Sequence, residues 1–219
     1  MAYDKVVDSG KLESDLKIVG DAIRAKGGAS APLEFPQGMA DAVAAISGGG
    51  SAGTSFADFI EGKVSEVRND TATEIASGSL TQTYYIKSLY FPEVIKINSE
   101  GCKENHNLTN IYFPKVQTIG STAFLGSKIS KVDFPVLKEI GHYVFLNNAR
   151  LETVILRFDG VATLKDRNAF GNTPIEKGTG YIYVPKALME QYKTATNWVA
   201  YAAQIRAIED YPEITGGAK

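Results

Sequence analysis

The sequence predicts a β-rich repeat solenoid of about five turns of 21–24 residues, with an N-terminal helical hairpin and a C-terminal helical cap. Three observations lead to this prediction. Phe-Pro dipeptides recur at residues 91–92, 113–114 and 134–135. Apolar and polar residues alternate before each dipeptide, as in a strand with one buried side. A Gly/Ser-rich stretch then separates this region from a helical pattern at the start of the chain.

The repeat is clearest when four segments are aligned. They begin at Ile86, Leu108, Ile129 and Leu151. These starts lie 22, 21 and 22 residues apart. Self-similarity with a period of about 20 to 29 residues is typical of a leucine-rich-repeat solenoid. We assign residues 56–184 to this solenoid, with a divergent first turn over residues 64–80 and a truncated last turn from Ile175.

The second aligned segment illustrates how one turn is expected to fold. Ile111 and Phe113 should point into the core, because side chains alternate along a strand. Asn110 and Tyr112 should point outward. Pro114 has no N–H to donate and is expected to end the strand. A single turn cannot bury its apolar side, so stacked turns are expected to share one continuous core.

Residues 1–47 are predicted to form two short helices. The first helix carries an apolar stripe with heptad-like spacing, made by Leu12, Leu16, Val19 and Ile23. A hairpin docked on the same chain and a docking or oligomerisation segment are both open interpretations. We favour the second, because a flexible Gly/Ser linker follows at residues 48–55.

Residues 185–212 are predicted to form the helical cap, with Pro185 near the first helix start. The end of a solenoid must hide the last layer of its core. Apolar bulk for this purpose comes from Leu188, Tyr192, Trp198, Tyr201 and Ile205. Residues 213–219 are expected to be a flexible tail.

Composition and motifs argue against catalysis. Lys and Arg number 23 and Asp and Glu number 25, a balance that disfavours a nucleic-acid partner. One Cys and two His exclude a disulfide framework, a multi-cysteine zinc site and a His-rich metal centre. The sequence contains no phosphate-binding loop, hydrolase elbow or metalloprotease motif. We therefore expect no enzyme, no catalytic residue, no metal and no cofactor.

Alignment of the repeats assigns the cysteine and both histidines to particular places in their turns. Cys102 aligns with Phe124 one turn later, so it should fill an inward aromatic position as an inert thiol. His106 and His142 fall on polar bends at different places in their turns, so we expect no catalytic pair. Trp198 is expected to pack in the cap.

Outward strand positions are expected to form two rows across the turns. One row contains Tyr90, Tyr112, Asp133 and Ile155, and its neighbour contains Ser88, Asn110, Lys131 and Thr153. Regular strand faces of repeat proteins bind ligands, and Tyr offers rigid contact area. An ordinary solvated sheet is the alternative, because Tyr also favours strands. The candidate binding residues are Tyr90, Asn110, Tyr112, Lys131 and Asp133, and the expected ligand is a protein or a glycan.

The sequence also predicts where the protein is made. The first residues lack the apolar region of a secretory signal. No apolar run of about 18 residues occurs, so we expect no membrane insertion. The chain is therefore expected to be made in a cytoplasm without an export address.

Three parts of the chain resemble known families. The pattern LxxIxFPxVxxIGxxAF over residues 64–184 resembles the BspA-like class of bacterial leucine-rich repeats. Residues 6–28 and 33–46, and the closing residues 173–213, resemble the ends of tail or baseplate-associated structural proteins from phages and prophages of Gram-positive bacteria.

The resemblance implies a virion protein assembled in the host cytoplasm. Its partners would be other tail or baseplate proteins, and by analogy it would form a homo-oligomer, with a trimer favoured. The repeat region would act as a spacer or as a host-surface adhesion or receptor-binding module. A bacterial leucine-rich-repeat adhesin or protein-interaction module is the alternative. Secreted cellular relatives carry export signals, whereas a virion protein leaves the cell by lysis.

Overall fold

The computed structural model describes residues 65–215. The chain divides into two units, Met1–Lys63 and Val64–Lys219. The helices predicted over residues 1–47 and the linker over residues 48–55 lie outside the described residues. The same holds for the predicted self-association stripe of Leu12, Leu16, Val19 and Ile23.

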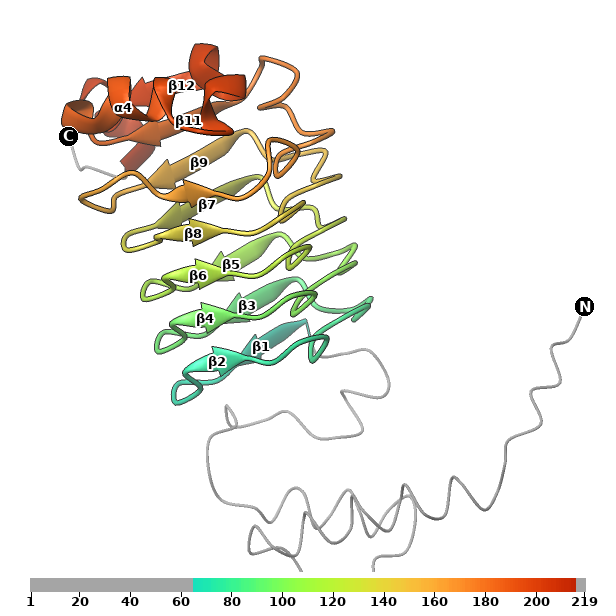
Figure 1. Ribbon diagram of the computed structural model, residues 1–219. Coiled ribbons are helices and arrows are strands. Elements are labelled where there is room, and N and C mark those ends of the chain that lie inside the picture. The colour runs from blue at the N-terminus through green and yellow to red at the C-terminus, as the bar shows by residue number, and fades with distance from the viewer. Residues whose placement is uncertain (1–64, 216–219) are drawn as a thin grey trace, which may run out of the picture. The chain divides into compact units, whose positions relative to one another are not determined.

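Short parallel strands stack in two ladders, which Figure 1 shows one behind the other. The first ladder consists of two hydrogen-bonded sheets. One contains β1 (Glu66–Arg68), β3 (Ser88–Tyr90) and β5 (Asn110–Tyr112), and the other contains β7 (Lys131–Phe134), β9 (Thr153–Leu156), β11 (Tyr181–Val184) and β12 (Ile205–Ala207). The second contains β2 (Glu74–Ile75), β4 (Lys96–Ile97), β6 (Thr118–Ile119), β8 (Glu139–Ile140) and β10 (Thr163–Leu164). The described part is therefore β-rich with few helices, as predicted. The second ladder is an element that the sequence pattern did not predict.

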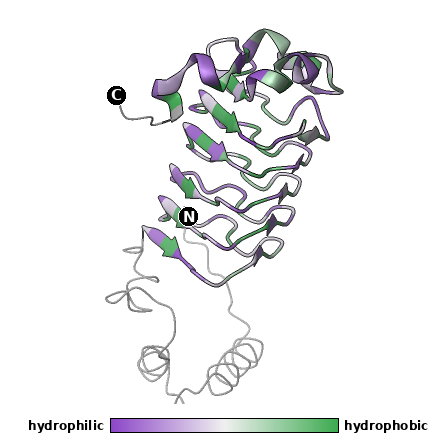
Figure 2. Ribbon diagram, turned by 90° about the vertical axis from the view of Figure 1, so that its left-hand side faces the viewer, coloured by the Kyte–Doolittle hydropathy of each residue, from purple (hydrophilic) through white to green (hydrophobic). Residues whose placement is uncertain are grey.

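Alternation along the strands separates the core from the surface. In β7, Val132 and Phe134 are buried whereas Lys131 and Asp133 are exposed. Figure 2 shows the same alternation as changes between hydrophobic and hydrophilic colour along the strands. In β5 and just after it, Tyr112 is 46% exposed and Phe113 only 2%. These values confirm the predicted inward and outward phase of the repeat.

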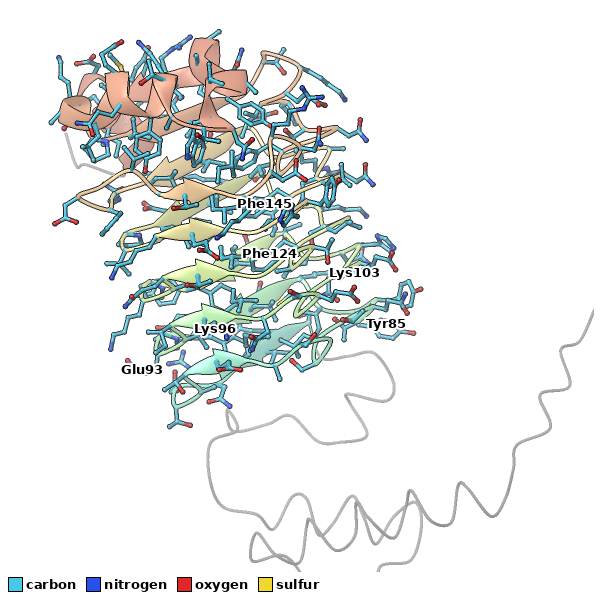
Figure 3. The ribbon with its side chains drawn as sticks, viewed as in Figure 1. Tyr85, Glu93, Lys96, Lys103, Phe124 and Phe145 are labelled. Carbon is cyan, nitrogen blue, oxygen red and sulfur yellow. The ribbon has the colours of Figure 1, made fainter. Side chains whose placement is uncertain are left out.

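A column of aromatic side chains runs through the core. The rings of Phe124 and Phe145 lie 5.6 Å apart with planes 6° from parallel, and Phe145 repeats this geometry with Phe170. Figure 3 shows Phe124 and Phe145 in successive turns inside the stack. Cys102 is fully buried one turn earlier, and its N–H donates to the carbonyl of Ala123. This confirms the inward position predicted for the cysteine.

The chain after β11 continues the column. It forms η1 (Lys186–Leu188), α4 (Met189–Thr194) and η2 (Trp198–Gln204). The Trp198 ring lies 6.1 Å from the Phe170 ring, and its Nε1 donates to the carbonyl of Ala162 at 2.6 Å. Tyr201 meets the same Phe170 ring edge-on at 5.3 Å. Trp198 is only 1% exposed, so this residue serves packing.

The end of the chain differs from the predicted helices and tail. Strand β12 pairs in parallel with β11, with Ile205 opposite Ile182. The helical prediction was therefore wrong over this stretch, because the free edge of β11 offers hydrogen bonds that outweigh local propensity. Two 3-10 helices follow, η3 (Ile208–Asp210) and η4 (Pro212–Thr215). Residues 213–215 thus belong to an element, not to the flexible tail predicted for them.

One buried polar position recurs in successive turns. Its occupants are Asn105, Ser127, Asn148 and Thr173. The Asn105 amide donates to the carbonyls of Leu80 at 2.7 Å and Cys102 at 2.9 Å, and its oxygen accepts the N–H of Thr83 at 2.8 Å. These bonds satisfy backbone groups between neighbouring turns. The sequence pattern did not predict this polar row.

Candidate functional site

The candidate binding surface is the outward side of the first ladder. Parallel pairing places Tyr112 beside Tyr90 and Asn110 beside Ser88. The first outward row contains, in order, Arg68, Tyr90, Tyr112, Asp133, Ile155, Tyr183 and Arg206. The second contains Glu66, Ser88, Asn110, Lys131, Thr153 and Tyr181. All five candidate residues therefore lie in these two rows.

The rows are interrupted between β5 and β7. These strands belong to different hydrogen-bonded sheets, so Tyr112 and Asp133 are not register partners, contrary to the continuous row expected. The spacing of the Phe-Pro dipeptides shortens from 22 to 21 residues at this step. We call the outward side chains of β1, β3 and β5 the open half. Those of β9 and β11 form the covered half, and β7 lies at the boundary.

The open half presents a stack of planar groups. The rings of Tyr90 and Tyr112 lie 4.5 Å apart and 8° from parallel. The guanidinium carbon of Arg68 lies 4.2 Å from the Tyr90 ring centre, on a side chain also held by Asp70 at 3.0 Å. Among residues 65–215, Tyr112 has no further ring or cation partner besides Tyr90. The open half thus ends in a preorganised aromatic side chain, Tyr112, which is 46% exposed.

Polar groups flank this stack. The Asn110 amide donates to the Ser88 hydroxyl at 3.4 Å, and Asn110 is exposed. Amide and hydroxyl groups beside rigid aromatic rings are typical of recognition surfaces.

The two candidate residues on β7 already have partners within the chain. The Asp133 carboxylate binds the Arg157 guanidinium at 2.9 Å from Nε and 2.7 Å from the terminal nitrogen. Hydrogen bonding to Asp133 raises the pKa of Arg157. The Lys131 ammonium donates to the carbonyl of Ile214 at 2.5 Å. Tyr90, Asn110 and Tyr112 therefore lie together as predicted, whereas Lys131 and Asp133 are engaged elsewhere.

The covered half contains outward side chains that solvent does not reach. Ile155 is fully buried and Tyr183 is 5% exposed, yet neither belongs to the core cluster. The expectation that Ile155 is exposed was therefore wrong. The Tyr211 ring meets the Tyr183 ring edge-on at 5.3 Å, and Ile214 is held by Lys131 on β7. Ile155 lies on β9, between the strands that carry these two attachment points.

We call residues 208–215 the strap. Its first part is fixed by Lys186, whose N–H donates to the Glu209 carboxylate at 2.9 Å and whose ammonium pairs with Asp210 at 2.8 Å. Burial raises the pKa of the Tyr183 hydroxyl beneath it, and the neighbouring Tyr211 adds to this effect. No sequence signal indicated that this segment returns to the strand face.

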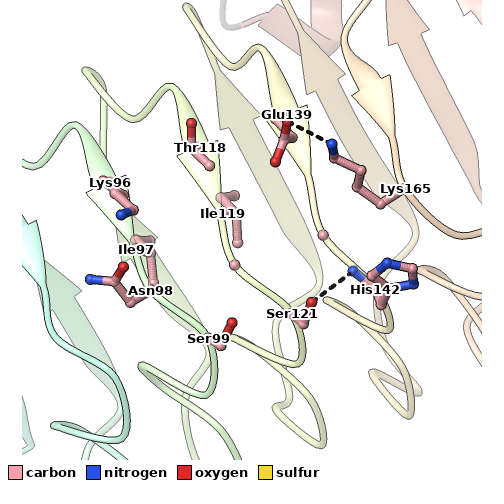
Figure 4. Close-up of a pocket in the computed structure, with 12 residues that line it drawn as sticks. Lys96, Ile97, Asn98, Ser99, Thr118, Ile119, Ser121, Glu139, His142 and Lys165 are labelled. Carbon is pink, nitrogen blue, oxygen red and sulfur yellow. Dashed lines mark hydrogen bonds and ion pairs between the residues drawn. The ribbon is translucent and has the colours of Figure 1, made fainter.

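The second ladder carries a shallow pocket of its own around β4, β6 and β8 (Figure 4). Gly120 forms part of its floor, where a Cβ would approach the backbone nitrogen of Ser99 to 2.4 Å. Close stacking of the turns therefore requires glycine at this position. Glu139 and Lys165 form an ion pair of 3.1 Å at the rim. The sequence pattern did not predict this pocket.

The histidines lie where the sequence placed them, on exposed bends. His142 lines the second-ladder pocket and its Nδ1 lies 3.3 Å from the Asp166 carboxylate. Hydrogen bonds from the Asn168 backbone and from His142 hold the pKa of Asp166 below its usual value. The Nδ1 of His106 contacts the carbonyl of Gly126 at 3.0 Å. The two rings therefore have separate partners.

Groups with metal-binding or nucleophilic chemistry are sparse in this part of the chain. Burial raises the pKa of the Cys102 thiol well above its ordinary value, so the thiolate is strongly disfavoured. Within residues 65–215, no three His, Cys, Asp or Glu side chains cluster in a way that could hold a metal ion. No helix in that range is long and apolar enough to cross a membrane.

Comparison with known protein families identifies the repeat. The family model for the BspA type leucine rich repeat region matches residues 72–188 in six copies, more than half of the chain. Among solved structures, the chain is similar to the pneumococcal vaccine antigen PcpA, with 20% sequence identity and a TM-score of 0.36. That likeness covers 56% of this chain and 36% of PcpA, so the chain spans little more than a third of that structure. No curated protein matches the sequence.

Proposed function

Because the chain belongs to the BspA-type leucine-rich repeat family, we propose that it is a non-enzymatic recognition protein that binds a macromolecular ligand through the open half. The repeat region is a domain of the protein-interaction or adhesin-like kind. Beyond this, we propose that the domain is carried on a phage or prophage tail, where it contacts the host surface.

The observation that carries the binding proposal is the stack of Arg68, Tyr90 and Tyr112. Its rings are held parallel before any ligand arrives, so little side-chain entropy is lost on binding. Tyr112 is 46% exposed although its neighbour Phe113 is buried. Tyr and Arg are also the residue types that dominate binding energy at interfaces.

The absence of catalysis is supported by the environments of the reactive side chains. The Cys102 thiol is fully buried, and its raised pKa opposes nucleophilic chemistry. His106 and His142 contact different groups, a backbone carbonyl and a carboxylate, on different turns.

The proposed virion location is supported by the resemblance of the two ends of the chain to tail or baseplate-associated proteins. Mass spectrometry of purified particles from an induced host culture tests this location. We expect the protein in the particle fraction together with other tail proteins, in a constant ratio. Recovery only from the bacterial surface would overturn the virion location and favour the alternative of a cellular adhesin.

Binding by the open half is tested by adding the labelled protein to intact host cells. Tyr112→Ala should weaken binding at least about tenfold, because it removes the exposed end of the stack. Val199→Ala is the matched control, since Val199 is 60% exposed on η2, away from the strand face. Equal binding by both variants would show that the ligand contacts another surface.

A further inference from the structure

The second-ladder pocket owes its shape to a change in side-chain size between turns. The position directly after each strand is occupied, from β4 to β10, by Asn98, Gly120, Gly141 and Lys165. A Cβ at Gly120 would lie 2.4 Å from the backbone nitrogen of Ser99, and one at Gly141 would lie 2.7 Å from that of Ser121. Close stacking therefore excludes side chains in these two turns, and a hollow remains between Asn98 and Lys165.

This hollow has the size of a ligand site. Its volume is about 430 Å³, within the range of small-molecule pockets. Asn98 and Lys165 stand three turns apart, which is ~14 Å at the spacing of paired strands. Two rows of polar side chains flank the glycines (Figure 4), namely Lys96, Thr118 and Glu139 on the strands, and Ser99, Ser121 and His142 beyond them.

The side chains at the two ends are held in place, whereas others in the pocket are free to bind. The Asn98 amide nitrogen donates to the carbonyl of Ile75 at 3.0 Å and to the Glu74 carboxylate. Lys165 is held by its ion pair with Glu139. Within residues 65–215, the Lys96 ammonium and the Thr118 hydroxyl have no hydrogen-bond partner. The pocket thus combines fixed ends with unused hydrogen-bonding groups.

The lining argues against an apolar ligand and against an added strand. Its apolar members, Ile97 and Ile119, are fully buried, so they offer no contact area to an apolar group. Strand β6 pairs with β4 on one side and with β8 on the other. The backbone of this ladder is therefore already paired where the pocket lies, and an extended peptide finds no free strand edge there.

The charges argue against an anion as well. Lys96 and Lys165 are the cations of the pocket, and Glu139 lies between their strands. Two more carboxylates adjoin it, Glu74 through Asn98 and Asp166 through His142. The positive charge is therefore balanced locally, so the pocket does not attract anions. What it suits is a neutral ligand whose groups both donate and accept hydrogen bonds, as hydroxyl groups do.

We propose that the second-ladder pocket binds a short stretch of a neutral saccharide chain, at a site separate from the open half. The bare backbone at Gly120 and Gly141 lets a sugar ring approach the floor closely. Sugar hydroxyls accept hydrogen bonds from Lys96 and Thr118 and donate to the oxygen of Asn98. The side chains of Asn98 and Lys165 limit the length of the bound stretch.

Isothermal titration of the full chain with maltotriose and with triacetylchitotriose tests the proposal. At least one of these neutral probes should bind saturably. Thr118→Tyr should abolish that binding, because the ring fills the pocket from a half-buried, outward strand position. Thr118→Val should weaken it about threefold, since it keeps the branched shape and removes only the hydroxyl.

Two controls accompany these variants. Lys177→Ala changes an exposed lysine outside the pocket and should leave saccharide binding unchanged. Tyr112→Ala, which alters the open half, should also leave it unchanged. Thermal unfolding of each variant checks that the fold is retained, and Thr118→Val remains informative if the larger tyrosine perturbs the turn.

Three results would overturn the proposal. One is no saturable binding of either neutral probe. Another is binding of trigalacturonic acid with no binding of the neutral probes, because the pocket would then select a negative charge. The third is saccharide binding that Tyr112→Ala abolishes and Thr118→Tyr leaves intact, which would place the saccharide on the open half. Cell binding that depends on Tyr112 is measured separately, so the proposed function can stand or fail independently.

Discussion

Tyr112 and Tyr183 both lie on the outward side of the first ladder, in separate hydrogen-bonded sheets, but their environments are opposite. The first is 46% exposed and the second 5% exposed. Their strands pair in the same parallel manner, and a guanidinium lies near a tyrosine ring in both regions, Arg68 beside Tyr90 and Arg206 of β12 beside Tyr181. The difference arises from the strap, which covers one half and leaves the other to solvent. In a repeat of this kind, strand position decides which way a side chain points, whereas other segments decide whether a ligand can reach it.

A second contrast lies at the step between the halves. Strands β5 and β7 do not pair. In the same turn, the row of buried polar residues formed by Asn105, Ser127, Asn148 and Thr173 lacks some of its hydrogen bonds. Ser127 stands where neighbouring turns have Asn105 and Asn148. The hydroxyl of Ser127 and the amide oxygen of Asn148 lack hydrogen-bond partners among the described residues. The open and covered halves thus meet where the turns are least well joined.

The largest effect should distinguish the inward residues from either half of the outward face. Phe113→Ala should lower the free energy of unfolding by about 3–5 kcal/mol, because it opens a cavity in the shared core. Tyr112→Ala should lower it by about 1 kcal/mol, the value of a lost aromatic pair. Thermal or urea unfolding checks both. Equal losses would contradict the assigned phase.

The next effect tests whether the strap alone makes the covered half different. In the full chain, Ile155→Ala should cost about 2–5 kcal/mol, as for a buried side chain. In a chain ending at Asp210 the same substitution should cost about 0.5 kcal/mol or less, since Ile155 would be exposed. The double-mutant cycle between the substitution and the truncation is measured by urea unfolding. An unchanged cost would mean that another segment buries Ile155.

The smallest effect concerns the step between the halves. Ser127→Asn should raise the free energy of unfolding by about 1 kcal/mol, because an amide at this position completes the polar row and gives Asn148 a partner. Ser127→Ala is the control, since it removes the unpaired hydroxyl without adding a donor. Both are compared by thermal unfolding. An Asn variant less stable than the Ala variant would show that this turn cannot hold the larger side chain.

Much of the repeat could be predicted because its signals are local. The Phe-Pro dipeptides mark the strand ends, and the alignment of Cys102 with Phe124 correctly placed a thiol in an aromatic position. The neighbouring positions of Tyr90 and Tyr112 were found the same way, because their strands lie one repeat period apart. The polar row was missed, since Asn105 and Asn148 look like ordinary bend residues until their carbonyl partners in other turns are known.

The sequence by itself determined the direction of the strand residues in the aligned repeats, because alternation and period depend only on neighbours along the chain. The tertiary structure decided which outward residues remain accessible. The hydrogen bond that holds the strap on the strand face joins Lys131 to Ile214, 83 residues apart. Strand β12 forms by pairing with the edge of β11. Contacts of that range leave no periodic trace in the sequence, so Ile155 and Tyr112 look alike until the chain is folded.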